Sequence, residues 1–270
     1  ENGVFSIAGQ DYKEFPSDPI MKESASLEIE ADKILDIISF TKNSTSKDEL
    51  KPSLQGVLLK IERERIVGVS TDGHRLSRII TTNNSNIDKD FEIIAPTKFL
   101  TILSSFIEKK DKIDLEISNE YMSLSHKNIT LFSKIIKDNY PDYEKVIPLD
   151  NNKTLQVNKK QIEEAIKRVS IFSNRSTKQI TLNIENSHVE LTTEDAENNT
   201  RGKEKIIATY KGEENIKIGF NSHFILEAIT NIKKEDVIFF LNNPLSAAII
   251  SEKEKETDKL ILLMPIRLND

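Results

Sequence analysis

The feature that most constrains this chain is a weak internal repeat with a period of about 125 residues. In the first copy, residues 27–30 alternate apolar and polar side chains as a strand does, and apolar residues then recur at helical spacing up to Ile38. The same step from strand to helix recurs at 155–169, where Asn158 and Gln161 have the spacing of a helix-capping pair. A period of this length is too long for a solenoid and indicates a duplicated domain.

Each copy also predicts a second strand followed by a helix, with alternating hairpins between and after these elements. The second strand-and-helix steps lie at 91–107 and 216–232. The clearest hairpins lie at 113–124 and 180–191. The pattern predicts an α+β fold of repeated domains, each with antiparallel sheet and two helices on one face.

Composition limits the classes of protein that this chain can belong to. With 270 residues and 37% hydrophobic residues, two domains are expected. The absence of cysteine excludes disulfides, thiolate metal sites and cysteine nucleophiles. There is no apolar run long enough to span a membrane, and the first residues lack the features of a signal peptide, so we expect a cytoplasmic protein that does not bind membranes.

The net charge of -6 argues against a simple nucleic-acid-binding protein, which normally carries a basic balance. The chain nevertheless contains 38 Lys and Arg. A protein in which basic and acidic residues occupy different faces would reconcile both observations.

Asp72 and His74 raise the possibility of acid/base catalysis, because a carboxylate can orient an imidazole. The alternative is structural: Asp-Gly favours a tight turn, and Gly73 can adopt a positive φ. No motif supplies a nucleophile, and no glycine-rich phosphate loop occurs. The remaining histidines, His126, His188 and His223, are far from one another in the sequence. The sequence therefore predicts no cofactor and no metal site.

Three separated motifs, which stand in the order in which a known family has them, carry a resemblance to that family. Thr-Asp-Gly-His-Arg-Leu (71–76) follows Leu-Gln-Gly-Val-Leu-Leu (54–59), Tyr-Pro-Asp-Tyr (140–143) precedes Val146, and Leu-Leu-Met-Pro-Ile-Arg-Leu (262–268) lies near the end. Together they resemble the bacterial DNA polymerase III beta subunit, the sliding clamp. The resemblance implies repeated DNA-clamp domains and a processivity factor without enzymatic activity. It also implies a ring of two three-domain subunits that encircles duplex DNA without sequence preference.

The resemblance also suggests how the chain divides. We expect 27–148 and 149–270 to be the second and third clamp domains of the family. Residues 1–26 match the end of a truncated first domain, because Phe-Ser and Phe-Pro at 5–6 and 15–16 echo Phe-Ser and Tyr-Pro at 132–133 and 140–141.

The family binds short peptides of the replicative polymerase and the clamp loader in a hydrophobic groove, and other polymerases and repair proteins are possible partners. Apolar side chains there would hold the anchors of the peptide, and Arg or His at the rim would hydrogen-bond it. Phe224 stands where some members have Tyr, and residues 269–270 extend beyond the usual end. The matching groove residues are Leu54, Thr71, Gly73, His74, Arg75, Leu76, Pro141, Val146, Asn221, Phe224, Leu262, Met264, Pro265, Ile266, Arg267 and Leu268.

Basic residues on the predicted helices are the candidates for facing DNA, with a solvated helix face as the alternative. Lys98 matches a basic position of the family, whereas the others follow only from their place on a helix. The candidates are Lys33, Lys42, Lys98, Lys159, Lys160, Lys167, Arg168, Lys233 and Lys234.

Two alternatives belong to other functional classes. A peptide-binding scaffold of the same fold that never encircles DNA would bind peptides but show no salt-sensitive DNA association. A hydrolase using Asp72 and His74 would show turnover that disappears in His74→Ala.

Overall fold

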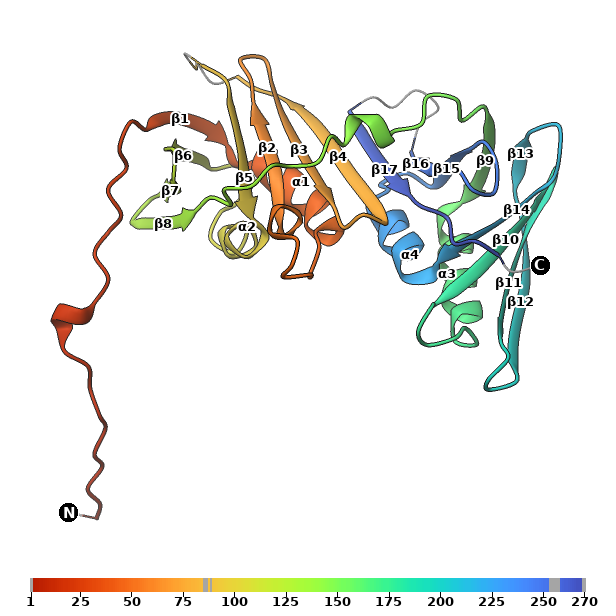
Figure 1. Ribbon diagram of the computed structural model, residues 1–270, viewed down its shortest axis with the longest axis horizontal. Helices are drawn as coiled ribbons and strands as arrows, with labels where there is room; N and C mark the ends of the chain where they lie inside the picture. Colours follow the sequence, from red (N-terminus) through yellow and green to blue (C-terminus); the bar gives the residue numbers. More distant parts are fainter. Residues whose placement is uncertain (1, 85–86, 88, 253–257, 269–270) are drawn as a thin grey trace.

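The computed structural model describes residues 2–84, 87, 89–252 and 258–268. Two units with the same order of elements follow one another along the chain (Figure 1). The first contains β1 (Ala25–Glu30), α1 (Ala31–Thr41), β2 (Gly56–Ile61), β3 (Arg65–Thr71), β4 (Arg75–Thr82), β5 (Phe91–Pro96), α2 (Thr97–Leu103), β6 (Lys112–Ile117), β7 (Tyr121–His126) and β8 (Ile129–Lys134).

The second unit repeats this order with one additional short strand, β13 (Thr209–Lys211). Four 3₁₀ helices lie outside the repeat or in its connections: η1 (Tyr12–Glu14), η2 (Lys42–Ser44), η3 (Pro52–Gln55) and η4 (Glu144–Val146). The other elements are β9 (Lys153–Asn158), α3 (Lys159–Ser170), β10 (Gln179–Glu185), β11 (His188–Asp195), β12 (Thr200–Ile207), β14 (Ile216–Asn221), α4 (Ser222–Thr230), β15 (Asp236–Leu241), β16 (Ala248–Ser251) and β17 (Lys259–Leu263).

The two units join edge to edge in one sheet. Its nine strands have the order β13-β9-β15-β16-β17-β4-β3-β2-β5, in which β17 of the second unit pairs antiparallel with β4 of the first. Leu262 lies opposite Leu76, and Leu263 lies opposite Arg75. Each unit keeps a second sheet of four strands, β1-β6-β7-β8 in the first and β12-β11-β10-β14 in the second. The predicted α+β class with antiparallel sheets is confirmed.

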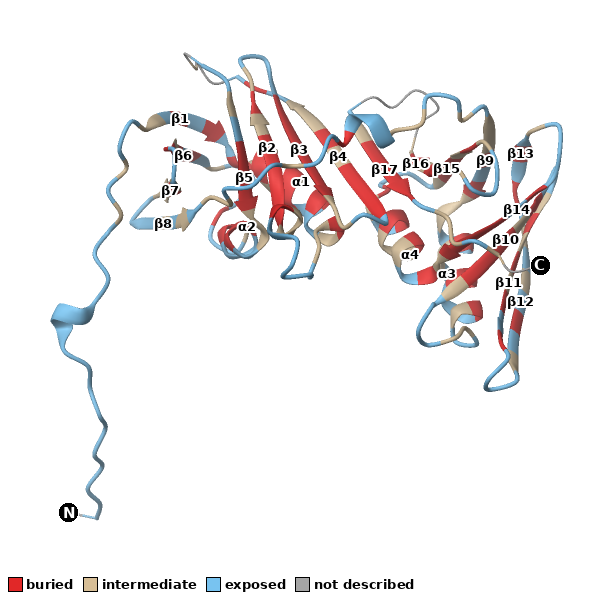
Figure 2. Ribbon diagram, viewed as in Figure 1, coloured by how far each residue is buried: buried red, intermediate tan, exposed pale blue. Residues whose placement is uncertain are grey.

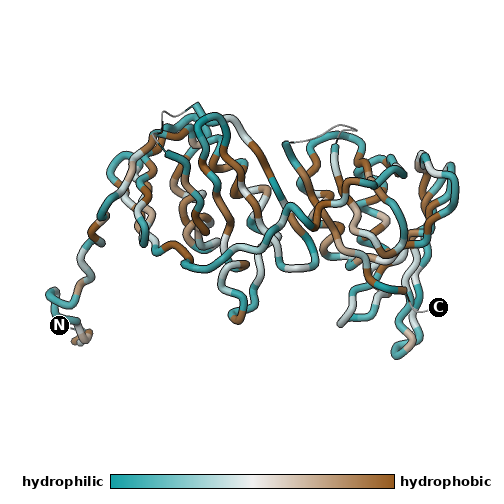
Figure 3. Tube along the Cα trace, turned by 45° about the horizontal axis from the view of Figure 1, so that its top comes forward, coloured by the Kyte–Doolittle hydropathy of each residue, from teal (hydrophilic) through white to brown (hydrophobic). Residues whose placement is uncertain are grey.

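Both faces of the nine-stranded sheet are covered, but by different parts of the chain (Figures 2 and 3). On one face, the apolar side chains of all four helices join a single large core that extends through both units. On the other face, a smaller cluster contains Leu76, Leu262 and Tyr143, with Tyr140 and Ile136 packed against it. Tyr140 and Tyr143 lie in the segment that connects the two units. This segment therefore crosses the outer face of the sheet, opposite the helices.

The predicted helix start at Asn158 is confirmed, because its side-chain oxygen accepts a hydrogen bond from the Gln161 amide at 3.2 Å. The second helix of each unit is shorter than the apolar pattern predicts. Helix α2 ends at Leu103 rather than near Ile107, since Ser104 and the residue after it form tight turns with backbone carbonyls of the last helical turn. Helix α4 ends at Thr230 in the same way.

Residues 2–24 extend away from the first unit and are almost entirely exposed (Figures 1 and 2). Apart from η1 they contain no helix or strand. Phe5 and Phe15 are therefore not packed against a core, although their sequence echoes residues in and after β8. Among the described residues, no helix is both long and apolar enough to cross a membrane.

Candidate functional site

The turn between β3 and β4 is held by its own side chains. Gly73 adopts a φ of +92°, which a residue with a side chain rarely does. The Thr71 hydroxyl donates to the Arg75 carbonyl at 2.6 Å and accepts from the Gly73 amide at 3.1 Å. One carboxylate oxygen of Asp72 accepts from the amides of His74 and Arg75 at 2.9 and 3.0 Å. The turn is therefore preformed, and it presents the His74 side chain to solvent.

The C-terminal segment lies against this turn. The Met264 amide donates to the His74 carbonyl at 2.8 Å, and the Ile266 amide donates to the Gly219 carbonyl at 2.8 Å. The Leu268 side chain lies so close to Gly219 that a methyl group added to that glycine would stand 2.6 Å from it. Residues 264–268 therefore run from the turn of the first unit across β14 of the second.

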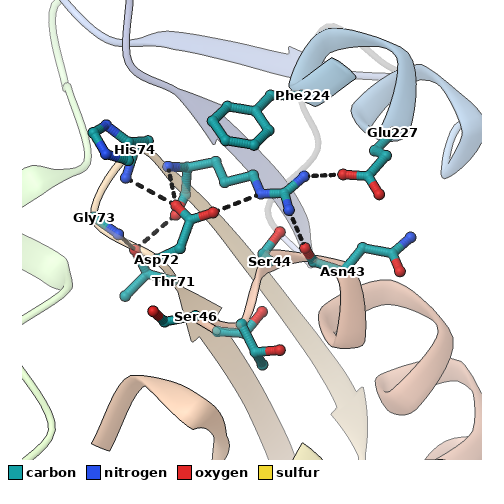
Figure 4. A network of polar contacts seen from close by, with 12 residues as sticks. Asn43, Ser44, Ser46, Thr71, Asp72, Gly73, His74, Phe224 and Glu227 are labelled. Carbon is teal, nitrogen blue, oxygen red and sulfur yellow. Dashed lines mark hydrogen bonds and ion pairs between the residues drawn. The ribbon is translucent and has the colours of Figure 1, made fainter. Parts of the chain in front are cut away.

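Arg75 lies beneath this surface rather than at its rim. Its Nε donates to Asp72 at 3.0 Å, and its terminal nitrogens donate to Glu227 of α4 and to the Asn43 carbonyl in η2 (Figure 4). The guanidinium carbon is 4.3 Å from the centroid of the Phe224 ring. Arg75 is only 8% exposed, and each of its three nitrogens donates one hydrogen bond inside the protein, so His74 is the more accessible of the two side chains that were expected to hydrogen-bond a peptide.

The residues of the predicted groove divide by exposure. His74 and Phe224 stack with ring centroids 6.4 Å apart, and Phe224 is the third residue of α4, whose Asn221 cap accepts from the amides of residues 223 and 224. The buried members are Arg75, Leu76 and Leu262; the half-buried members are Leu54, Thr71, Asn221, Phe224, Pro265, Ile266 and Leu268; the exposed members are Gly73, His74, Pro141, Val146, Met264 and Arg267.

Of these residues, Leu76 and Leu262 belong to the outer cluster, whereas Phe224 packs against the core on the helix face. Pro141 lies between Tyr140 and Tyr143, which pack in the same cluster as Leu76 and Leu262. The Tyr140 hydroxyl donates to the Val69 carbonyl at 3.4 Å. Burial raises the pKa of both tyrosines, that of Tyr143 to about 12. Leu54 belongs to η3, where its carbonyl accepts from the Ser46 amide at 2.8 Å.

Glu227 was not predicted from the sequence. The one sequence feature that could have pointed to it is its position three residues after Phe224 on the same helix, which places both side chains on one face. Its partner Arg75, however, comes from the other unit, and no local pattern reveals that pairing.

The helix-face cations differ in how far their charge is already paired. Lys167 pairs with Glu163 at 2.5 Å, and the hydrogen bonds that Arg168 donates to Glu204 lower the pKa of that carboxyl group. Lys33 pairs with Glu30 at 3.9 Å, Lys233 pairs with Asp36 at 3.9 Å, and Lys159 donates to the Ile232 carbonyl. Within the described residues, the exposed candidates without such a contact are Lys42, Lys98, Lys160 and Lys234.

The geometry gives no support to catalysis by Asp72 and His74. The Asp72 carboxylate contacts the backbone amide of His74, not its imidazole, and its second oxygen is occupied by Arg75. Among the described residues, no group of three or more His, Cys, Asp or Glu side chains could hold a metal ion.

Two repeated α+β units whose strands join edge to edge, with helices on one face and a connecting segment on the other, define the class of DNA sliding clamps. Residues 28–142 match the family model of the DNA polymerase III beta subunit, central domain, and residues 144–267 match that of the C-terminal domain. The chain belongs to the DNA polymerase III beta subunit family.

Curated relatives and solved structures agree with this assignment. The chain is 25% identical to the beta sliding clamp of Pseudomonas aeruginosa over 265 residues, which cover 98% of this chain and 71% of the relative. It is 27% identical to that of Bacillus subtilis over 273 residues, which cover 97% and 70%. The crystal structure of the Bacillus subtilis clamp matches with a TM-score of 0.90 at 25% identity and covers 100% of this chain and 71% of that one. A Pseudomonas aeruginosa clamp bound to griselimycin matches with a TM-score of 0.87 at 25% identity and covers 95% and 69%.

Proposed function

We propose that this chain acts as part of a DNA sliding clamp: it encircles duplex DNA and binds peptide motifs of DNA polymerases and the clamp loader on its outer face. Residues 27–148 and 149–270 would be its second and third clamp domains, and residues 1–26 the end of a preceding one. The clamp performs no bond chemistry. A polymerase tethered to an encircled duplex rebinds its primer end at high effective concentration, so tight DNA binding is not required.

The observation that carries peptide binding is the contact between the C-terminal segment and the turn at Gly73. The hydrogen bond from the Met264 amide to the His74 carbonyl joins the C-terminal segment to the turn whose exposed imidazole stacks on the Phe224 ring. Val146 and Met264 are 53% and 43% exposed, whereas Ile147 packs against the outer cluster and Leu262 belongs to it. Such apolar surface on a rigid frame suits the aliphatic and aromatic anchors of a short peptide.

The repeat itself supports a ring. β4 and β12 are equivalent strands, and so are β17 and β8, yet only β4 and β17 pair with each other. Within the described residues, β12 and β8 each have a neighbouring strand on one side only. A clamp domain placed against each of these edges would repeat the junction between β4 and β17 and continue the chain of domains towards closure.

Exposed apolar side chains gather at these two edges. At the junction of β4 and β17, by contrast, the contact between the ends of the helices is polar, with Arg75 bridging Asn43 and Glu227. At the unpaired edges, the exposed apolar side chains are Ile129 and Phe132 on β8, Ile207 on β12, and Ile171 and Phe172 after α3, where Phe172 lies against Gly202 of β12. Burial of these side chains would favour domain association at both edges.

Duplex DNA would face the helices. Lys42, Lys98, Lys160 and Lys234 are the candidates best able to contact phosphates, because no carboxylate neutralises them within the described structure. The net charge of -6 does not oppose such binding when contacts are loose and confined to one face.

The test is titration of the chain with a fluorescent peptide that carries a clamp-binding motif, a glutamine followed by a leucine and phenylalanine anchor. We expect saturable binding at micromolar concentration that weakens in Met264→Ala and in His74→Ala. Matched controls are Ile129→Ala, an aliphatic side chain of similar exposure on β8, and His188→Ala on β11. Binding that none of the four variants weakens would contradict the assigned surface.

Retention on DNA distinguishes a sliding clamp from a peptide-binding scaffold of the same fold. A clamp remains on closed-circular duplex at a salt concentration that removes electrostatic binding, and it slides off linear duplex. A scaffold of the same fold would bind the peptide and show no difference between the two DNA forms.

A further inference from the structure

The guanidinium of Arg75 is the point at which three elements of both units meet. The turn between β3 and β4 contributes Asp72, η2 contributes the Asn43 carbonyl, and α4 contributes Glu227 (Figure 4). The side chain of Arg75 is 9% exposed. Each of its three nitrogens already donates a hydrogen bond to an oxygen of the protein.

Phe224 covers this buried charge. Its ring centroid lies 4.3 Å from the guanidinium carbon, a distance at which a cation and an aromatic face attract each other. The same ring stacks with the exposed imidazole of His74 at an interplanar angle of 24°. The orientation of Phe224, and with it one wall of the proposed peptide surface, therefore depends on where the guanidinium lies.

Glu227 determines that position from the second unit. It stands three residues after Phe224 on α4, so its ion pair with Arg75 fixes this helix relative to the turn that carries His74. Its other oxygen lies 3.5 Å from His223. If Glu227 were neutral, Arg75 would keep the Asp72 carboxylate and the Asn43 carbonyl, both of the first unit, and would lose the charged contact that ties its guanidinium to α4.

We infer that Glu227 is a positioning residue of the peptide-binding surface: it holds Arg75 beneath Phe224 and thereby keeps the Phe224 ring against His74, without itself touching the peptide. This inference rests on the proposed function. It also specifies which kind of peptide side chain this part of the surface accepts. Since Arg75 is engaged internally, an anchor at this position is apolar or aromatic and gains nothing from a carboxylate directed at Arg75.

The experiment compares Glu227→Gln with Glu163→Gln, which removes a carboxylate that pairs with Lys167 on α3. Three quantities are measured: the thermal midpoint, the affinity for the fluorescent clamp-motif peptide, and the NMR shifts of the His74 ring protons. Those shifts report the nearby Phe224 ring, and Phe224→Leu gives their value without it.

For Glu227→Gln we expect a loss of peptide affinity of at least about tenfold. We also expect His74 shifts that move towards those of Phe224→Leu. Glu163→Gln should change neither quantity. The shift is the decisive readout, because a uniform loss of stability would leave it unchanged in the folded protein.

A folded Glu227→Gln variant that binds within about twofold of wild type and keeps the wild-type His74 shifts would overturn the inference while leaving the proposed function intact. If wild type itself does not bind the peptide, the proposed function fails, and the inference with it. If Glu227→Gln does not fold, Glu227→Asp keeps the charge but shortens the side chain, and it is judged by the same two readouts.

Discussion

The amide of Met264 donates a hydrogen bond of 2.8 Å to the carbonyl oxygen of His74, and this contact joins the end of the second unit to a turn of the first. It continues the pairing of β17 with β4, whose last residue pair is Leu263 and Arg75. The proposed peptide surface is thus built at a junction between units. Changes at the junction are expected to affect stability and peptide binding together.

Leu76 tests the packing of that junction. It is buried in the outer cluster opposite Leu262, so Leu76→Ala should lower the free energy of unfolding by about 2–5 kcal/mol through reduced burial and a residual cavity. Urea unfolding measures the change. Leu149→Ala, at a side chain that is 98% exposed, is the control and should change stability by less than about 0.5 kcal/mol. Equal effects of the two substitutions would show that Leu76 is not packed as described.

Gly73 tests the turn. Its positive φ makes Gly73→Ala destabilising by about 1 kcal/mol, although the added methyl group would meet no atom within 4 Å. Peptide affinity should fall as well, because His74 follows directly. Gly9→Ala also adds a methyl group into open space, but without a positive φ, and should change neither quantity. A Gly73→Ala variant with unchanged unfolding free energy and affinity would exclude a role for the turn geometry.

Tyr143 should make the protein sensitive to alkaline pH. Burial raises its pKa to about 12, whereas an unfolded tyrosine ionises near pH 10. Below about pH 10 the tyrosine is neutral in both states; between about pH 10 and 12 only the unfolded state ionises, so the free energy of unfolding falls as the pH rises.

Tyr143→Phe should therefore reduce the loss of stability between about pH 8 and 11, measured by urea unfolding. Part of the loss should remain, since the pKa of Tyr140 is raised in the same way. The control Tyr12→Phe alters an exposed tyrosine in η1 and should leave the pH dependence unchanged. Identical pH dependence in both variants would contradict the assigned burial of Tyr143.

The lysines on the helices should differ in their contribution to DNA binding. In the assembled protein, Lys98→Ala or Lys160→Ala should each reduce the slope of log affinity against log salt concentration by about 0.9 for each phosphate that the lysine neutralises in wild type. Lys167→Ala should have a smaller effect, because this lysine already pairs with Glu163. Binding to a short duplex across a salt series measures the slopes. Equal slopes in all three variants would argue against direct interaction of these lysines with phosphates.

The edge at β12 should be required for the ring. Phe172→Asp places a charge among exposed apolar residues at this edge, so the assembled protein should lose its retention on closed-circular DNA while keeping peptide binding. Leu245→Asp introduces the same charge at an exposed position between β15 and β16 and should retain both. Retention by Phe172→Asp equal to that of the control would place closure elsewhere.

The sequence by itself determined what depends on neighbours along the chain. Alternating and helical periodicity predicted the repeated strand-and-helix steps, Asn158 was predicted as a helix cap, and Asp-Gly predicted the turn in which Gly73 has a positive φ. The order of the family motifs predicted the class of protein, which the family models and solved structures confirm. The ends of α2 and α4 were predicted too late, because buried apolar residues continue past the last helical turn.

Only the tertiary structure decided which edges meet and which charges are paired. The pairing of β17 with β4, the burial of Arg75 and its ion pair with Glu227 each join residues that are far apart in the sequence. The cost of burying a charge decides where Arg75 points, and that cost depends on partners from three elements, which periodicity along one segment cannot encode. For the same reason, a lysine on a helix face could be predicted from the sequence, but the carboxylate that neutralises Lys233 lies in the other unit and became visible only in the fold.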